Sequence, residues 1–236
     1  MATTATSKGK NEKSLKVVGT RPIRHDALDK VTGRARYGAD IHLPGMLHGK
    51  ILRSPHAHAK IINIDSSKAQ SLPGVKAVIT SEDFPIHENK TIDFSETQGN
   101  LRLLAGNVMA SGKVLYKGHA VAAVVATDQH TAEEALDLID VQYEKLEPVL
   151  DVRKAMEKDA PLLHYDLTTN FRVERFGKGE DTGVKSNIAG HIQFKRGDIG
   201  KGFEEADVIV EREFTTQPVH QGYIEPHTST AQWSPE

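Results

Sequence analysis

The chain carries its densest group of chemically useful side chains close to its end, at residues 219–227. This segment holds one carboxylate, two imidazoles and one amide, namely Glu225, His220, His227 and Gln221. A carboxylate among apolar residues is costly to bury unless it is paired or used in chemistry. Glu225 is therefore either a residue that caps a turn or pairs with an Arg, or one that hydrogen-bonds a substrate or tunes a cofactor. Spacing alone leaves both interpretations open.

Two other stretches carry residue types that often bind ligands. His56 and His58 could face one metal ion, but zinc needs three or four ligands and no further one lies nearby in the sequence. The glycines between 33 and 38 lack the spacing and the following Lys-Ser/Thr of a phosphate loop. We therefore predict a structural loop at 54–58, a solvated or partner-facing surface at 33–38, and no metal-binding or cofactor-binding residue in this chain.

Composition excludes several classes of protein. The 236 residues include no cysteine, which rules out disulfides, cysteine-bound iron–sulfur clusters and a cysteine nucleophile in this chain. The net charge of −2 indicates no strong attraction to nucleic acid or to an anionic membrane. No apolar run is long enough to cross a bilayer. We expect a soluble, cytoplasmic protein.

The middle of the chain has the clearest secondary-structure pattern. Residues 118–127 are almost continuously small and apolar, which is typical of a strand buried on both faces. Asp128 is placed to cap a helix at 129–138. Further strands are predicted at 47–53, 59–64, 75–80 and 140–143, a short helix at 68–71, and a long loop at 87–112. This pattern predicts an α+β (mixed α/β) domain over 36–150.

The flanking regions have weaker patterns. Residues 1–35 are expected to form a polar tail and an extended arm, and the glycine-rich, charged stretch 151–187 a linker with an insertion. The last region, 188–236, should contain a short helix and several strands. The helix is predicted at 199–206 and the strands at 187–195, 207–216 and 228–233.

Several separated blocks of sequence resemble one known family. They are Val-Gly-Thr-Arg-Pro-Ile-Arg-His-Asp at 18–26, Leu-Pro-Gly-Met-Leu-His-Gly-Lys-Ile at 43–51, Tyr-Lys-Gly-His-Ala-Val-Ala-Ala-Val-Val-Ala at 116–126, and Ile-Glu-Pro-His at 224–227. Together they resemble the N-terminal part of the molybdenum-binding large subunit of the xanthine dehydrogenase/aldehyde oxidase family. The resemblance implies an a/b hammerhead domain over 36–150 and the first strands of a molybdopterin-binding domain over 188–236.

The resemblance also implies a chemistry. Enzymes of this family activate water at a molybdenum centre on a pterin dinucleotide, and pass electrons through [2Fe–2S] clusters to FAD. Glu225 corresponds to the family's pocket carboxylate and would act as a catalytic residue that orients the substrate by hydrogen bonding. Gln221 would contribute to the same wall of the substrate pocket. The molybdopterin cofactor would be held by a partner chain, and the [2Fe–2S] clusters and FAD by further partner subunits.

Two family motifs are missing, and their absence shapes the functional hypothesis. The chain has neither the Gly-Gly-Gly-Phe-Gly cofactor loop nor the late Gly-Glu segment that supplies the catalytic base. We therefore expect a multi-subunit enzyme that this chain cannot run alone. Either the large subunit is split between two polypeptides, which we favour, or the sequence is a piece of a longer chain.

Other functions stay open. A non-catalytic scaffold or interaction protein and an accessory protein for cofactor insertion are alternatives of a different class. Within the family, reductase or hydratase chemistry is an alternative to hydroxylation.

Overall fold

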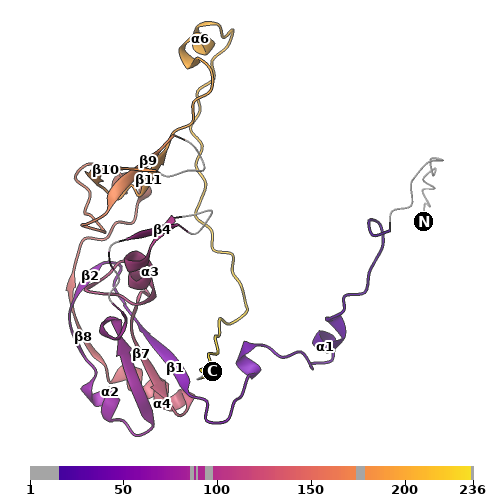
Figure 1. Cartoon of the computed structure of the whole chain (residues 1–236), viewed down its shortest axis with the longest axis vertical. Coiled ribbons are helices and arrows are strands. Elements are labelled where there is room, and N and C mark those ends of the chain that lie inside the picture. Colours follow the sequence, from indigo (N-terminus) through magenta and orange to yellow (C-terminus); the bar gives the residue numbers. More distant parts are fainter. Residues whose placement is uncertain (1–15, 86–87, 89, 94–97, 174–178, 235–236) are drawn as a thin grey trace. The chain divides into compact units, whose positions relative to one another are not determined.

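The computed structural model describes residues 16–85, 88, 90–93, 98–173 and 179–234. The chain separates into two units: Gly45–Thr216 is one, and Met1–Pro44 with Gln217–Glu236 is the other. The described residues of the larger unit form three three-stranded sheets and a two-stranded one, and Figure 1 shows how these strands are arranged. Within the described residues, no helix has the length and apolar character needed to cross a membrane.

The central sheet of the larger unit is built on β7 (Ala120–Ala126). This strand pairs antiparallel with β1 (His48–Arg53) on one edge and β3 (Val75–Thr80) on the other. Five of its seven residues are buried. Because both edges are hydrogen-bonded and both faces covered, only a run of apolar residues is tolerated there. The prediction for 118–127 is confirmed.

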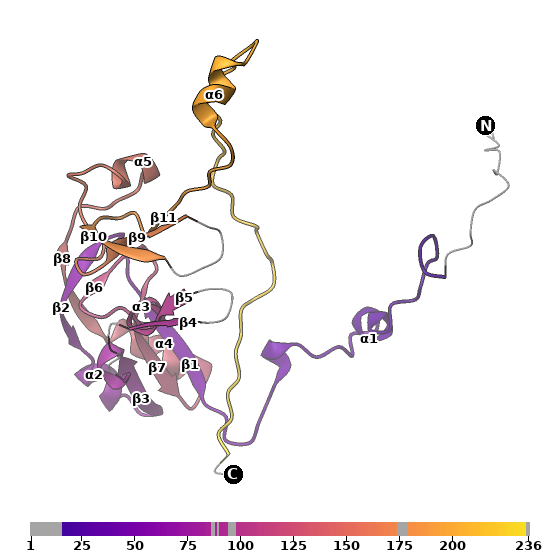
Figure 2. The same cartoon turned by 45° about the horizontal axis from the view of Figure 1, so that its top comes forward.

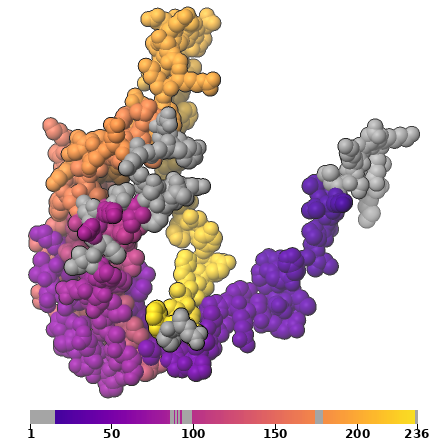
Figure 3. Space-filling view, viewed as in Figure 1, coloured from indigo at the N-terminus to yellow at the C-terminus, as the bar shows by residue number. Residues whose placement is uncertain are grey.

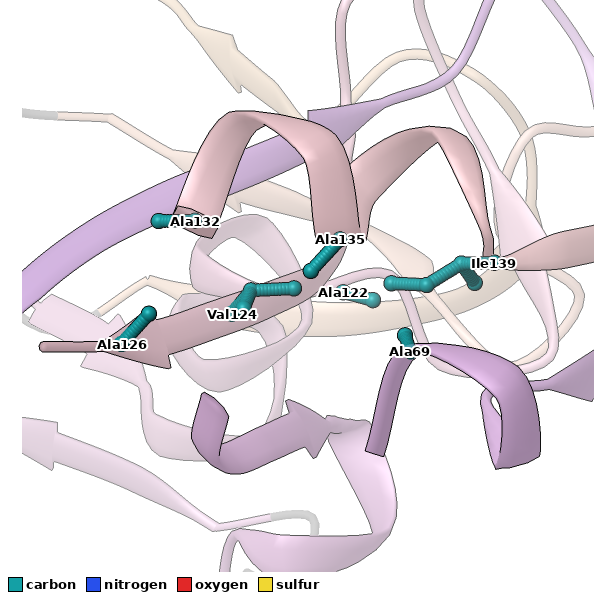
Figure 4. Packing of buried hydrophobic residues seen from close by; sticks show 7 residues of the cluster. All are labelled: Ala69, Ala122, Val124, Ala126, Ala132, Ala135 and Ile139. Atoms are coloured by element: carbon teal, nitrogen blue, oxygen red, sulfur yellow. The ribbon is translucent and has the colours of Figure 1, made fainter. Parts of the chain in front are cut away.

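Helix α4 (Gln129–Asp137) covers one face of this sheet. Asp128 caps it, because its Oδ1 accepts a hydrogen bond from the Thr131 amide at 2.9 Å. Ala135 points from the helix towards Val124 of β7, and Ala132 and Ala69 of α2 (Ser67–Ser71) belong to the same buried cluster (Figure 4). These small side chains let the helix lie close to the strand.

In a second sheet, β2 (Ala59–Asp65) is the central strand. It pairs antiparallel with β6 (Lys113–Val114) on one side and with β8 (Asp140–Lys145) on the other. Ala59 and Val114 from this sheet and Val121 from β7 are fully buried together. Ile64 and Val141 contact both this cluster and the one under α4. The two sheets therefore share one continuous apolar interior.

The long loop predicted for 87–112 is wrong. Its described residues contain strands β4 (Thr91–Asp93) and β5 (Gln98–Asn100), which pair antiparallel, and helix α3 (Leu101–Val108). Asn100 starts the helix, because its side-chain oxygen accepts hydrogen bonds from the Arg102 and Leu103 amides. Residues 86–87, 89 and 94–97 of the predicted loop lie outside the described part of the chain.

The stretch predicted as a linker contains regular structure. After α5 (Val152–Ala155), strand β9 (Thr168–Arg172) pairs with β10 (Glu180–Lys185) and, in parallel, with β11 (Gly190–Ile192). The strand predicted at 187–195 is thus confirmed only in its middle. The domain boundaries at 151, 187 and 188 stay predictions.

The two ends of the chain differ most from expectation. Helix α6 (Ile199–Glu204) forms as predicted, but the strands predicted at 207–216 and 228–233 are wrong, since these residues have no regular secondary structure. A strand needs a neighbour for its amides and carbonyls. The arm that was expected to be extended contains helix α1 (Ala27–Val31). Two short 3-10 helices lie outside this arm, η1 (Gly38–Asp40) and η2 (Ser81–Asp83).

The burial of β7 leads to a stability prediction. Val124 is fully buried, so Val124→Ala should lower the free energy of unfolding by about 2 kcal/mol through lost burial and the cavity left behind. Val210→Ala is the matched control, because Val210 is 72% exposed and should change stability by less than about 0.5 kcal/mol. Urea unfolding followed by circular dichroism measures both, and equal losses would contradict the assignment of the core.

Candidate functional site

The segment that carries Glu225 and Gln221 lies in an irregular, extended part of the chain (Figure 2). Gly222 adopts a left-handed conformation with φ of 70°, and its amide donates a hydrogen bond to His220 Nδ1 at 2.9 Å. This local turn separates Gln221 from Glu225. Both side chains are exposed. Among the described residues, neither forms a side-chain hydrogen bond or an ion pair.

The exposed segment does not by itself form a catalytic site. A carboxylate exposed to water binds a ligand only weakly, because water competes for its hydrogen bonds. In the described part of the chain, no group of three or more His, Asp or Glu side chains is arranged to hold a metal ion. The roles of Glu225 and Gln221 stay predictions.

The histidines at 56 and 58 have structural contacts. His58 is 4% exposed, and its Nδ1 donates to the Glu147 carbonyl oxygen at 2.7 Å. The His56 ring meets the Tyr143 ring edge-on, with centroids 5.0 Å apart. These contacts tie the 54–58 loop to β8 and the residues after it, in agreement with the predicted structural loop.

The structure brings together a second group of polar residues that the sequence did not indicate. A pocket of about 410 Å³ lies between α3, β6 and residues 163–166. It contains Lys113, His164, Tyr165 and the ion pair of Arg102 with Asp166. The pocket was missed because α3 was predicted as loop, so nothing placed Arg102 near Lys113. No local sequence signal indicates this pocket, because Arg102, Lys113 and residues 163–166 lie apart along the chain.

Burial changes the acid–base behaviour of this region. It lowers the pKa of the Lys113 ammonium, and it also lowers the pKa of His164, helped by the nearby positive charges of Lys113 and Arg102. Lys113 Nζ lies 4.0 Å from the centroid of the Tyr165 ring. Among the described residues, this buried nitrogen has no hydrogen-bond partner.

His119 connects the pocket wall to the central sheet. It is 1% exposed, and its Nε2 donates to the Gly106 carbonyl oxygen of α3 at 2.8 Å. Its Nδ1 accepts from the Leu115 amide at 3.2 Å, and its ring stacks on Tyr116. This arrangement needs a neutral imidazole. Burial lowers the pKa of His119 accordingly, outweighing the opposite effect of its hydrogen bond to Gly106.

Comparisons with known proteins match two parts of the chain. Residues 32–147 match the family model described as "Aldehyde oxidase and xanthine dehydrogenase, a/b hammerhead domain". Residues 181–236 match the "Molybdopterin cofactor-binding domain".

Among curated relatives, the carbon monoxide dehydrogenase large chain of Afipia carboxidovorans is 37% identical, over 89% of this chain and 25% of its own length. The nicotinate dehydrogenase large molybdopterin subunit of Eubacterium barkeri is 29% identical, over 95% of this chain and 46% of its own. The chain thus spans about a quarter to a half of the relatives it matches.

Solved structures show the same similarity. The reconstituted CO dehydrogenase from Oligotropha carboxidovorans is 40% identical, with a TM-score of 0.54 over 64% of this chain and 18% of that one. Quinoline 2-oxidoreductase from Pseudomonas putida 86 is 36% identical, with a TM-score of 0.51 over 62% of this chain and 19% of its own. The α+β hammerhead architecture predicted from sequence is confirmed.

The neutral His119 leads to a prediction for pH dependence. Folding lowers the pKa of His119. At a pH between the pKa of the folded chain and that of the unfolded chain, the unfolded chain therefore binds more protons. The free energy of unfolding should then decrease as the pH falls below about 6.5, the ordinary pKa of histidine. His164 adds to the same trend. His119→Gln should flatten this dependence, whereas His130→Gln, at an exposed position, should leave it unchanged. Urea unfolding at pH 7.5, 6.5 and 5.5 tests this. Parallel pH curves for wild type and His119→Gln would contradict it.

Proposed function

Because the chain belongs to the xanthine dehydrogenase/aldehyde oxidase family, as the N-terminal part of its molybdenum-binding subunit, we propose that it works within a multi-subunit molybdenum-dependent oxidoreductase. It contributes the hammerhead scaffold and one wall of the substrate pocket. A partner chain carries the rest of the molybdopterin-binding domain, including the cofactor and the catalytic base. The chain alone is inactive.

The observation that carries this proposal is the exposed apolar character of residues 207–234. Every large apolar or aromatic side chain in this range is at least 59% exposed, and the space-filling view shows the segment, orange to yellow, at the surface (Figure 3). These residues are Val208, Ile209, Val210, Phe214, Val219, Tyr223, Ile224 and Trp233. Single exposed apolar residues are ordinary, but a run of eight spread along one segment indicates an interaction surface.

Burial of this run supplies the driving force for assembly. Each large apolar side chain removed from water contributes about 1.5–3 kcal/mol, and the unpaired backbone of an extended segment is ready to add a strand to a neighbouring sheet. The run falls within the residues that match the cofactor-binding domain. The partner we propose is therefore the polypeptide that completes this domain.

Assembly would also change the surroundings of Glu225. Ile224 is 94% exposed next to it, so a partner that covers Ile224 also takes Glu225 out of bulk water. With water excluded, a carboxylate forms stronger hydrogen bonds to a substrate N–H or O–H group. We propose that Glu225 orients the substrate in this way and that the Gln221 amide adds to the same wall.

The electron-transfer groups belong to other subunits in this proposal. These 236 residues include no cysteine, so they cannot themselves ligate a cysteine-bound [2Fe–2S] cluster, and we assign the clusters to partner subunits. FAD is assigned to a further subunit. The relative named "6-hydroxypseudooxynicotine dehydrogenase complex subunit gamma" supports a complex of several chains.

Capture of the chain from its native cell tests the assembly. We expect molybdenum, iron and flavin to co-purify with additional polypeptides, as measured by metal analysis and absorption spectroscopy. Phe214→Asp should release the partners, because it places a charge in the surface that the partner chain would bury. Lys158→Asp, at an exposed position outside residues 207–234, should not release them. A metal-free chain that purifies alone would sink the proposal.

A substitution in the assembled enzyme tests the role of Glu225. Glu225→Gln should lower turnover by about 10–100-fold, the effect of losing a hydrogen bond to a charged acceptor, with molybdenum content unchanged. Glu211→Gln, in the same extended region, is the control and should keep full activity. Unchanged turnover in Glu225→Gln would remove Glu225 from the pocket while leaving the proposed assembly intact.

A further inference from the structure

The pocket between α3, β6 and residues 163–166 contains a cation that the proposed function does not use. Lys113 Nζ is buried in the pocket wall and, within the described residues, has no hydrogen-bond acceptor. It lies over the face of the Tyr165 ring, 4.0 Å from the centroid. A buried ammonium without an acceptor is unfavourable, and an aromatic face offsets only part of the lost hydration. The ammonium therefore offers an anion a strong hydrogen-bond donor.

The other charges of the pocket cancel. Arg102 is ion-paired with Asp166, so together they contribute no net charge. His164 has its pKa lowered by burial and by Lys113 and Arg102, which keeps its ring neutral at pH 7. One positive charge remains, that of Lys113. This charge matches a monoanion better than a phosphate dianion.

Three leucines form the apolar part of the remaining wall, and Gly106, Asn107 and Ser111 complete it. Leu103 of α3, Leu115 after β6, and Leu163 line the pocket around Lys113. Figure 2 shows α3 and β6 as neighbours in the larger unit. A volume of about 410 Å³ lies in the range of pockets that hold small organic molecules, about 300–1,000 Å³. An inorganic ion would leave most of this space and its apolar walls unfilled.

We propose that this pocket binds a small organic monocarboxylate. The carboxylate accepts a hydrogen bond from Lys113, and the apolar or aromatic body of the ligand lies against the three leucines. The pocket lies outside residues 219–227, so the proposal is independent of the molybdenum chemistry and of Glu225.

Titration of the full chain with benzoate tests the site. We expect saturable binding by calorimetry, and binding at least about tenfold weaker for benzamide, which has the same shape without the charge. Inorganic phosphate should also bind at least about tenfold more weakly. Lys113→Met should weaken benzoate binding by about tenfold or more, whereas Lys117→Met, at an exposed lysine in the following turn, should not change it.

A second measurement uses the unaltered chain and so does not depend on whether Lys113→Met folds. Benzoate should protect Lys113, and not Lys117, from acetylation by acetic anhydride, as read by mass spectrometry of peptides. Equal acetylation of Lys113 with and without benzoate would overturn the proposal. So would equal affinity for benzoate and benzamide, or a preference for phosphate.

One further outcome separates a free ligand from a protein partner. If benzoate does not bind, and Lys113→Met instead weakens co-purification of the partner chains, Lys113 receives an acidic side chain and the small-molecule proposal is overturned. A failure to bind benzoate would not contradict the proposed assembly, which is tested separately by Phe214→Asp and by the metal content.

Discussion

Strand β7 is the element on which the larger unit depends. It is hydrogen-bonded to β1 and β3 at its two edges, and its side chains reach both apolar clusters, through Val124 under α4 and Val121 towards β2. A strand in this position cannot carry a polar side chain without leaving it unpaired. Its Ala and Val residues are also small enough for α4 to lie close above them. The positions of β1, β3 and α4 follow from that packing.

The same requirement for burial explains why the end of the chain has no regular structure. Residues 207–216 alternate apolar and polar side chains as a half-buried strand does, and yet they form none. Alternation reports which side chains would face a core, but a strand exists only when a second strand accepts its hydrogen bonds. Helix α6 forms nearby because a helix satisfies its own backbone, with Asp198 as its cap. The contrast is in line with the proposal that this segment pairs with a partner chain.

The sequence was most informative where one short segment determines its own structure. The apolar run of β7 and the Asp128 cap of α4 predicted both elements. It was least informative for α3, because Gly106 and the polar residues around it do not form a helical pattern. Asn100 caps this helix, and the distant His119 stabilises it through a hydrogen bond to Gly106. Such a contact between distant residues has no local signal. Residue types and spacing single out Glu225, but its substrate-orienting role is implied only by the resemblance, because a lone carboxylate has no pattern that fixes its role.

The buried position of Lys113 follows from the register of the second sheet. Its neighbour Val114 is fully buried, and alternation along β6 turns Lys113 to the opposite side, beneath the 163–166 residues. Lys60 is its register partner on β2, and like charges at such positions repel each other. Lys60 is satisfied by Glu144 at 3.2 Å on β8, whereas Lys113 lies at the edge of the sheet with no strand beyond it in the described residues. The sheet therefore provides a carboxylate for one lysine and leaves the other to be neutralised by a group from outside.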